Sequence, residues 1–218
     1  MKNSKMITID KKTHIDDKKL QFAIKRLMDI ILSLIGIIIL LPVYLIIIIA
    51  IKLESKGATV FKQVRVGKDG ENFTIYKFRT MIVQAENKRT LNIDPNDLGN
   101  FVFQSKSDSR ITKVGSFLRR SSLDEIPQFF NVLFGQMSLV GPRPEIPDVV
   151  KYYPKSYQQR LLVLPGITGL AQISGRGEIE LGRTVAYDLN YIKDFSVILD
   201  IKIIFLTVIS VFKKEGAY

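Results

Sequence analysis

The sequence predicts an α+β protein, in which a mainly helical, membrane-associated domain carries a small β-hairpin and an N-terminal re-entrant membrane helix. Three observations lead to this prediction. Residues 27–51 form a nearly continuous apolar run. Residues 60–79 alternate with a period of two around a glycine-containing turn. Other apolar stretches, such as residues 126–134 and 197–212, have helical spacing or helical length. A length of 218 residues suits one domain of ordinary size.

The composition combines a high positive charge with an apolar character. The formal net charge is +11 and the mean hydropathy is +0.14, which favours an anionic membrane surface, a nucleic acid or a phosphorylated substrate as partner. No helix-turn-helix, zinc-knuckle or aromatic RNA-binding pattern occurs in the sequence, so we expect no nucleic-acid partner. Because cysteine is absent and the single histidine, His14, lies in a polar stretch, the chemistry must rest on carboxylates, Arg, Lys and hydroxyl groups.

The sequence divides into three segments: a polar tail at 1–19, an apolar segment at 20–56, and a larger domain at 57–218. The apolar segment is long enough to cross a bilayer, which takes about 20 residues. Lysine and arginine residues flank it on both sides, however, and Pro42 interrupts it. A helix that breaks at Pro42 and returns to the same face of the membrane agrees with both facts. A single tilted spanning helix with a proline kink is the alternative.

A β-hairpin and a basic helix are expected next. Residues 60–66 and 73–79 alternate as strands do, and Lys77 and Arg79 share one face, where they meet either solvent or phosphate. Residues 86–109 are polar and are interpreted as a long surface loop, of a kind that often forms a lid. Residues 109–120 predict a short helix that ends in two arginines, Arg119 and Arg120.

Asp124 and Glu125 form the motif around which the other polar residues are arranged. The apolar residues after them have the spacing i, i+3, i+4, i+7 and i+8, which predicts a helix with one buried face made by Ile126, Phe129, Phe130, Leu133 and Phe134. Pro127 has no N–H and is tolerated only in the first helical turn, so the helix is expected to begin near Leu123 or Asp124.

Two interpretations of this acidic pair are open. Ser122 and Glu125 have the spacing of a capping box, in which the acids are structural. Alternatively, the arginines nearby in the sequence bind phosphate, and a carboxylate beside a phosphate serves as a ligand to Mg²⁺ or as a nucleophile that forms an acyl phosphate.

Three further stretches lie downstream. Proline on both sides of Arg143, at Pro142 and Pro144, restricts the backbone and aims the guanidinium group. Residues 165–177 contain four glycines and an arginine, and are either a set of tight turns or a weak phosphate-binding loop. Residues 197–212 are short for a membrane span, so we expect them to lie in the membrane interface or to pack on the domain.

Four motifs, in this order, resemble the bacterial sugar transferase family, the monotopic polyprenyl-phosphate phosphoglycosyl transferases. The motifs are Lys77-Phe78-Arg79-Thr80-Met81, Ser121-Ser122-Leu123-Asp124-Glu125-Ile126-Pro127-Gln128, Val140-Gly141-Pro142-Arg143-Pro144 and Pro165-Gly166-Ile167-Thr168-Gly169. The resemblance covers about residues 20–218, and four motifs behind a proline-broken apolar segment are highly specific. The chain is similar to the minimal, catalytic-core form of that family.

The resemblance implies transfer of a sugar 1-phosphate from a UDP-sugar to undecaprenyl phosphate, with release of UMP, at the cytoplasmic face of the bacterial inner membrane. It also implies that Asp124 is a covalent nucleophile and that Asp124 and Glu125 hold Mg²⁺. The residues that it implies for nucleotide or phosphate binding are Arg143 with Pro142 and Pro144, and also Lys77, Arg79, Arg119, Arg120 and Asp188. A homodimer and a monomer are both compatible with the sequence.

Two other functions are alternatives. The first is a membrane-anchored adaptor without enzymatic activity, whose acids are helix caps. The second is a membrane-bound hydrolase of a nucleotide substrate, which would use the same aspartyl phosphate with water as acceptor. No motif selects a particular sugar or glycan pathway.

Overall fold

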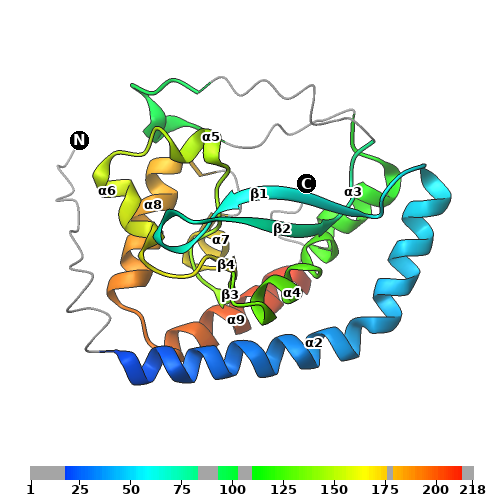
Figure 1. Cartoon of the computed structure of the whole chain (residues 1–218), viewed down its shortest axis with the longest axis horizontal. Helices are drawn as coiled ribbons and strands as arrows, with labels where there is room; N and C mark the ends of the chain where they lie inside the picture. Colours follow the sequence, from blue (N-terminus) through cyan, green and yellow to red (C-terminus); the bar gives the residue numbers. More distant parts are fainter. Residues whose placement is uncertain (1–17, 83–92, 103–109, 176–178, 213–218) are drawn as a thin grey trace.

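The computed structural model describes residues 18–82, 93–102, 110–175 and 179–212 (Figure 1). The helices in these ranges are α2 (Lys19–Glu54), α3 (Lys113–Arg120), α4 (Gln128–Leu133), α5 (Pro147–Val150), α6 (Lys155–Gln158), α7 (Leu170–Gly175), α8 (Leu181–Lys193) and α9 (Val197–Phe212). The strands are β1 (Val60–Val66), β2 (Asn72–Phe78), β3 (Ser138–Val140) and β4 (Gly166–Thr168). Short 3₁₀ helices are η1 (Lys68–Gly70), η3 (Leu98–Asn100), η4 (Leu123–Glu125) and η5 (Gln159–Leu162). The predicted mainly helical α+β class is confirmed. Nearly all of the predicted tail and most of the predicted loop at 86–109 lie outside the described residues.

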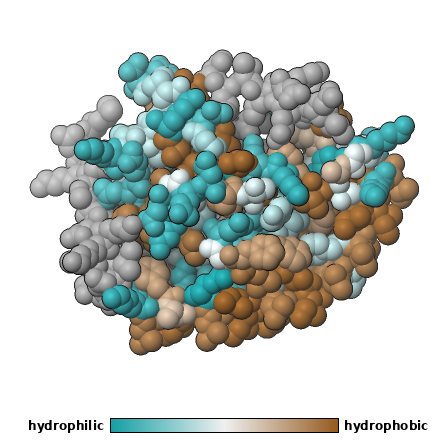
Figure 2. All heavy atoms as spheres, in the orientation of Figure 1, coloured by the Kyte–Doolittle hydropathy of each residue, from teal (hydrophilic) through white to brown (hydrophobic). Residues whose placement is uncertain are grey.

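Helix α2 is the longest element, and its outer surface is apolar. Pro42 lies within it, and Figure 1 shows α2 bending from the base of the molecule up one side. Ile38, Ile39 and Ile46 are exposed, and Figure 2 shows the apolar surface that runs along the base and up this side. Of the helices in the described ranges, α2 is the one with the length and composition to cross a membrane. The predicted long apolar helix is confirmed, whereas its path through a bilayer stays a prediction.

Strands β1 and β2 form the predicted antiparallel hairpin. The register pairs Val60 with Phe78 at one end and Val66 with Asn72 at the other. The turn between them contains Asp69 and Gly70 in left-handed backbone conformations, with φ of 57° and 82°. The second strand lies one residue earlier than the alternation predicts.

A second sheet, which the sequence pattern does not predict, joins β3 and β4 in parallel. Each strand has only three residues, too few for alternation to be recognised. The two strands lie close because of glycine: a Cβ atom on Gly166 would lie 2.1 Å from the backbone nitrogen of Gly141, and one on Gly169 would lie 2.3 Å from the Gly141 carbonyl oxygen. In the described part of the glycine-rich stretch, these glycines therefore serve backbone packing.

Two apolar clusters hold these elements together. The larger one joins α8, α9, β3 and the end of α4, with Val132, Val140, Ile192 and Ile203 almost completely buried. The smaller one joins the second half of α2 to β2 and α3, and contains Tyr44, Ile47, Ile51, Phe78 and Leu118. The acidic motif lies on this second cluster, since Leu123 and Ile126 pack against it from either side of the pair.

The predicted helix at the acidic motif begins later than expected. Ser122 has a left-handed backbone with φ of 56° and makes no side-chain cap, so the capping box does not form. Leu123–Glu125 is a single 3₁₀ turn, and α4 begins only at Gln128, directly after Pro127. The two carboxylates thus lie on a tight turn between α3 and α4. The structure replaces the capping interpretation with a strained turn that leaves both carboxylates outside a regular helix.

The buried face predicted for this helix is wrong in part. The fully buried residues of α4 are Gln128, Asn131 and Val132, whereas the side chains of Phe130 and Phe134 are 37% and 66% exposed. Helical spacing identifies the apolar side of a helix, but it does not say whether protein or lipid covers that side. Asn131 is buried because its amide binds the backbone of β2, with Oδ1 accepting from the Tyr76 N–H and Nδ2 donating to the Thr74 carbonyl.

Candidate active site

Glu125 lies at the centre of a charged group that is assembled from three parts of the chain. Its Oε1 accepts a hydrogen bond from Lys77 Nζ at 2.7 Å and another from Arg143 Nη2 at 2.8 Å. Lys77 comes from β2 and Arg143 from the turn that follows β3. The side chains of Glu125 and Lys77 are 18% and 15% exposed. Two charge-assisted bonds to one partly buried oxygen fix the carboxylate firmly.

The adjacent carboxylates are in different electrostatic surroundings. Burial raises the pKa of Asp124 to about 6, and the neighbouring charge of Glu125 adds to this effect, against the positive charges of Lys77, Arg119 and Arg143. Burial also acts to raise the pKa of Glu125, but the charges of Arg143 and Lys77 outweigh it and hold that pKa well below its usual range. Glu125 is therefore ionised at all ordinary pH values, whereas Asp124 titrates closer to neutrality.

The cations of the group are affected as well. Burial lowers the pKa of Lys77, and the charge of Glu125 works in the opposite direction. The charge of Glu125 raises the pKa of Arg143 above its ordinary value, against the effect of burial. This arrangement of a carboxylate, a lysine and an arginine in a partly buried site suits the binding of phosphate oxygens next to Asp124.

The two basic residues at the end of α3 differ in their relation to Asp124. Arg119 Nε donates to the hydroxyl of Thr80 at 2.9 Å, and its charge acts on Asp124. Arg120 is exposed at the end of the helix. Of the two arginines, Arg119 is thus the one that the structure brings to the acidic pair.

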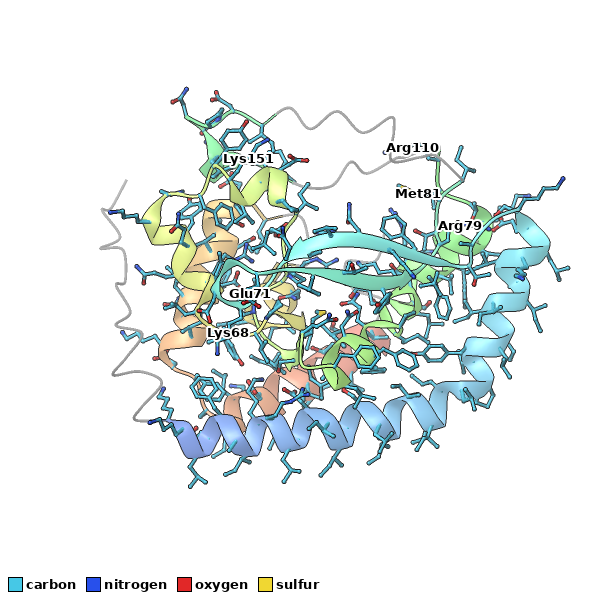
Figure 3. The ribbon with its side chains drawn as sticks, in the orientation of Figure 1. Lys68, Glu71, Arg79, Met81, Arg110 and Lys151 are labelled. Carbon is cyan, nitrogen blue, oxygen red and sulfur yellow. The ribbon has the colours of Figure 1, made fainter. Side chains whose placement is uncertain are left out.

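Arg79 has other partners. Its guanidinium donates to the Lys56 carbonyl at 2.9 Å and to the Ser55 carbonyl at 2.8 Å, and it is only 9% exposed. Figure 3 shows Arg79 where the hairpin meets the end of α2. Helix C-termini offer unpaired carbonyl oxygens, and a buried guanidinium satisfies them. This role ties α2 to β2 and takes the place of the substrate contact expected for Arg79.

Asp188 is also buried away from solvent. It lies in α8, is 1% exposed, and has its Oδ2 2.6 Å from Arg160 Nη2. Arg160 and Asp188 thus form a buried ion pair. Burial raises the pKa of Asp188 to about 6 despite the charge of Arg160. A substrate contact, as the sequence suggested, does not fit this buried position.

The Pro142-Arg143-Pro144 turn is supported by residues that the sequence did not single out. Pro142 and Pro144 are buried. The carbonyl of Arg143 accepts from Arg160 Nη2 at 2.9 Å, and that of Pro144 accepts from Arg65 Nη1 at 3.0 Å. Sequence reasoning missed Arg65 and Arg160 because each lies in a segment without any motif, and a charged pair formed across the fold leaves no local pattern.

The two carboxylates can be tested for their fit to the predicted Mg²⁺. Within the described ranges, no group of three or more Asp, Glu, His or Cys side chains gathers around one point. Mg²⁺ commonly binds one or two carboxylates and takes its other ligands from water and substrate phosphates. The two cationic partners of Glu125 both bind Oε1. Asp124 and Glu125 therefore fit a cation whose coordination is completed by a phosphorylated substrate.

Comparisons with known proteins identify the family of this chain. The family model for bacterial sugar transferase matches residues 20–214. A UDP-glucose:undecaprenyl-phosphate glucose-1-phosphate transferase of Klebsiella pneumoniae is 46% identical over 202 residues, which cover 89% of this chain and 41% of the relative. The galactosyl transferase CpsE of Streptococcus agalactiae serotype III is 43% identical over 194 residues, or 88% of this chain and 43% of the relative.

An undecaprenyl-phosphate galactose phosphotransferase of Salmonella typhimurium is 39% identical over 199 residues, which cover 89% of this chain and 42% of the relative. The chain thus spans about two fifths of the length of the curated relatives it matches. The match includes the acidic pair, the hairpin, the Pro-Arg-Pro turn and α2. This chain belongs to the bacterial sugar transferase family.

Proposed function

We propose that this chain transfers a sugar 1-phosphate from a UDP-sugar to undecaprenyl phosphate and releases UMP, as a first membrane step of glycan synthesis. The observation that carries the proposal is the acidic pair, in which Lys77 and Arg143 bind Glu125 while burial and the charge of Glu125 raise the pKa of Asp124 to about 6. The printed names of the relatives, which include glucose and galactose phosphotransferases acting on undecaprenyl phosphate, support the reaction class.

In the proposed first step, Asp124 is the nucleophile. A carboxylate oxygen attacks the phosphorus that carries the sugar, and the bond from that phosphorus to the bridging oxygen of the diphosphate breaks. UMP leaves with the electron pair, and a phosphosugar ester of Asp124 remains. Lys77 and Arg143, which both bind the neighbouring Glu125, would hold the phosphate oxygens beside the attacking carboxylate.

In the second step, an oxygen of undecaprenyl phosphate attacks the same phosphorus, and the carboxylate of Asp124 is released. No net proton is taken up or lost over the two steps. Mg²⁺, held by Asp124 and Glu125 together with substrate phosphate, would neutralise the diphosphate and the leaving UMP. Because UMP leaves before the lipid phosphate arrives, the site never holds two anionic substrates together.

The position of α2 supports a re-entrant anchor with the catalytic domain on the cytoplasmic face of the inner membrane. Near its start, Lys25 Nζ donates to Asp200 of α9 at 2.5 Å, and at its end Glu54 accepts from the N–H of Val114 in α3 at 3.1 Å. A straight helix of 36 residues would be about 54 Å long and would carry one end far from the domain. Contacts at both ends with one domain fit a helix that bends at Pro42 and returns.

The acceptor would reach the site from the apolar side of the molecule. Ile198, Ile201 and Phe205 of α9 are exposed, as is Phe134 after α4. These side chains would enter the membrane interface and leave the acidic pair close to the lipid headgroups, where the phosphate of a long isoprenoid lipid lies.

The test is to incubate the purified protein and Mg²⁺ with UDP-glucose, UDP-galactose and UDP-N-acetylhexosamines, with and without undecaprenyl phosphate. UMP release and intact protein mass are measured together. We expect lipid-dependent turnover and a phosphosugar adduct that is absent from Asp124→Asn. Lipid product without an adduct would contradict the covalent step. Repeated turnover of UMP release without lipid, beyond one UMP per protein, would favour the hydrolase, and absence of UMP with every donor would favour the adaptor.

A further inference from the structure

The Pro-Arg-Pro turn is held through its carbonyl groups. Four consecutive residues, Pro142 to Glu145, have carbonyl oxygens that accept hydrogen bonds from elsewhere in the fold. The outer two, Pro142 and Glu145, accept from backbone N–H groups at 2.9 and 2.8 Å. The inner two accept from arginine side chains: Arg143 from Arg160 at 2.9 Å, and Pro144 from Arg65 at 3.0 Å. Because the two prolines have no N–H, carbonyl acceptors are the main way to fix this segment.

The two arginines are themselves fixed. Arg160, from η5, has a side chain that is 1% exposed, and its Nη1 donates to the hydroxyl of Tyr153 at 2.6 Å. Arg65, from β1, donates through Nη2 to Gln63 at 2.7 Å. A guanidinium group is planar, so a second bond to a fixed partner sets the direction of the first.

Two acids balance the charge of the arginines. The carboxylate of Glu145 lies between them, with Oε1 3.6 Å from Arg160 and Oε2 3.8 Å from Arg65. Asp188 Oδ2 lies 2.6 Å from Arg160 Nη2. Two positive and two negative groups thus form a neutral cluster beneath the turn. Buried ion pairs seldom stabilise a fold more than apolar residues of the same volume would, so stability alone is a weak reason for this cluster.

We propose that Arg65 and Arg160 are positioning residues, which hold the backbone of the Pro-Arg-Pro turn so that Arg143 reaches Glu125 and the substrate phosphate. The proposal rests on the proposed function. Neither arginine touches substrate in this account; each acts through the carbonyl it binds. Asp188 and Glu145 keep Arg160 in place, which gives the buried carboxylate of α8 a role in the reaction without a substrate contact.

The experiment compares Arg160→Met and Arg65→Met, each alone and combined with Arg143→Ala, by UMP release in the full chain with Mg²⁺ and lipid acceptor. The matched control is Arg26→Met. Arg26 also binds two consecutive carbonyls, those of Val132 at 2.6 Å and Leu133 at 3.0 Å, but these belong to α4 and not to the turn. A thermal unfolding midpoint is recorded for every variant, so that lost folding is separated from lost positioning.

We expect each single variant at the turn to lower kcat by about tenfold to a hundredfold, since a shift of about 1 Å in a positioned group has effects of that size. In the Arg143→Ala background the same substitutions have little further effect, because they act through Arg143. Arg160→Lys, which keeps the positive charge but donates from a single nitrogen, restores part of the activity. Arg26→Met lowers the unfolding midpoint. Its effect on kcat is independent of Arg143, so in the double variant the two fold-changes multiply.

A second readout does not depend on activity. Nitrogen-15 NMR of the arginine side chains follows the guanidinium of Arg143, whose signal is identified by its absence from Arg143→Lys. The hydrogen bond to Glu125 protects the N–H protons of Arg143 from exchange with water. We expect this protection to be lost in Arg160→Met and Arg65→Met and kept in Arg26→Met. A protected Arg143 signal in both turn variants, or full additivity with Arg143→Ala, would overturn the positioning role. If the unsubstituted chain releases no UMP, the proposed function fails, and NMR alone decides on the positioning of Arg143.

Discussion

Asp124 and Glu125 are adjacent in the chain, yet their pKa values shift in opposite directions. The pKa of Asp124 rises to about 6 through burial and the charge of Glu125, while Arg143 and Lys77 hold that of Glu125 low against the effect of burial. Two carboxylates whose pKa values are shifted in opposite directions take different roles. Glu125 organises the cations, and Asp124 is left as the group whose state changes with pH.

The rate of the first chemical step should therefore fall at acidic pH. A nucleophilic carboxylate must be ionised, so the rate should fall as the pH drops through about 6, by about tenfold for each further pH unit. Bound Mg²⁺ would move this acidic limb of the pH profile, in which the rate falls, to lower pH. The measurement is the pH profile of UMP release in a single turnover without lipid acceptor.

Glu125→Gln tests the direction in which Glu125 shifts the pKa of Asp124. It removes the negative charge that raises the pKa of Asp124, and it leaves the charges of Lys77 and Arg143 unbalanced, which lowers that pKa further. The acidic limb should thus move to lower pH, even though the maximum rate falls. A limb that stays in place or moves to higher pH would contradict this account of the pair.

Among the elements, α3 determines where the acidic turn lies. Its first N–H groups are capped by the carboxylate of Glu54 and by the hydroxyl of Thr112, which accepts from Gly115 at 2.9 Å. Its end leads through Ser122 into the turn that carries Asp124. The helix fits against Thr80 because Gly115 has no side chain: a Cβ atom there would lie 2.1 Å from the Thr80 carbonyl oxygen.

Gly115→Ala should be costly for this reason. The contact is with backbone, which cannot move aside, so we expect a loss of about 1–3 kcal/mol in the free energy of unfolding. Activity should fall as well, since α3 and the acidic turn must shift together. Gly99→Ala is the control, because its Cβ would lie 3.5 Å from the Tyr157 hydroxyl, an ordinary contact. Denaturant unfolding and UMP release measure both effects, and equal behaviour of the two variants would contradict the close-packing argument.

At the scale of the whole molecule, α2 is attached along its length to the elements that carry the acidic pair and its partners. The attachments are Lys25 to Asp200, Asp29 to the N–H of Leu139, and Glu54 to the start of α3, with Tyr44 between them donating to the Ile126 carbonyl. Helix α2 is therefore a part of the folded domain, and the acidic turn rests directly on it.

The proposed topology predicts where single cysteines react, and the natural absence of cysteine makes the labelling clean. Lys19→Cys and Lys56→Cys, at the two ends of α2, should both react with an impermeant maleimide in inverted membrane vesicles and not in intact spheroplasts. Ile39→Cys, exposed on the apolar surface, should be shielded by lipid in both. Labelling of one end only from outside the cell would show a spanning helix.

Local patterns predicted the parts of the fold that depend on neighbours in sequence. Alternation located the β-hairpin within one residue, and hydropathy located α2. The short parallel pair β3 and β4 was not predicted, because it depends on close backbone approach between distant segments. The 3₁₀ turn at Leu123–Glu125 was not predicted either, because it follows a left-handed backbone at Ser122 that no sequence pattern indicates. The same limit applied to α4, where the spacing of apolar residues could not show whether lipid or protein covers the apolar side of the helix.

For the site, the sequence nominated the acidic pair and a set of basic residues, but not their contacts. Lys77 and Arg143 bind Glu125 from positions 48 and 18 residues away, whereas Arg79, from the same motif as Lys77, binds the end of α2. Arg160, which holds the turn, lies in no motif. Residue types near a site can be predicted from sequence, but which of them meet is decided by the fold.

The attachment of α2 at both ends has a consequence for how the protein responds to its lipid environment. A helix that bends and returns occupies one leaflet. Hydrophobic mismatch acts on segments that reach both surfaces of a bilayer, so it should have little effect on such a helix. In vesicles of phosphatidylcholines with progressively longer acyl chains, turnover at constant acceptor density should stay nearly level. A sharp optimum at one chain length would instead indicate an anchor matched to the full hydrocarbon thickness. The enzyme would thus keep its site at a constant height above the headgroups in membranes of differing thickness.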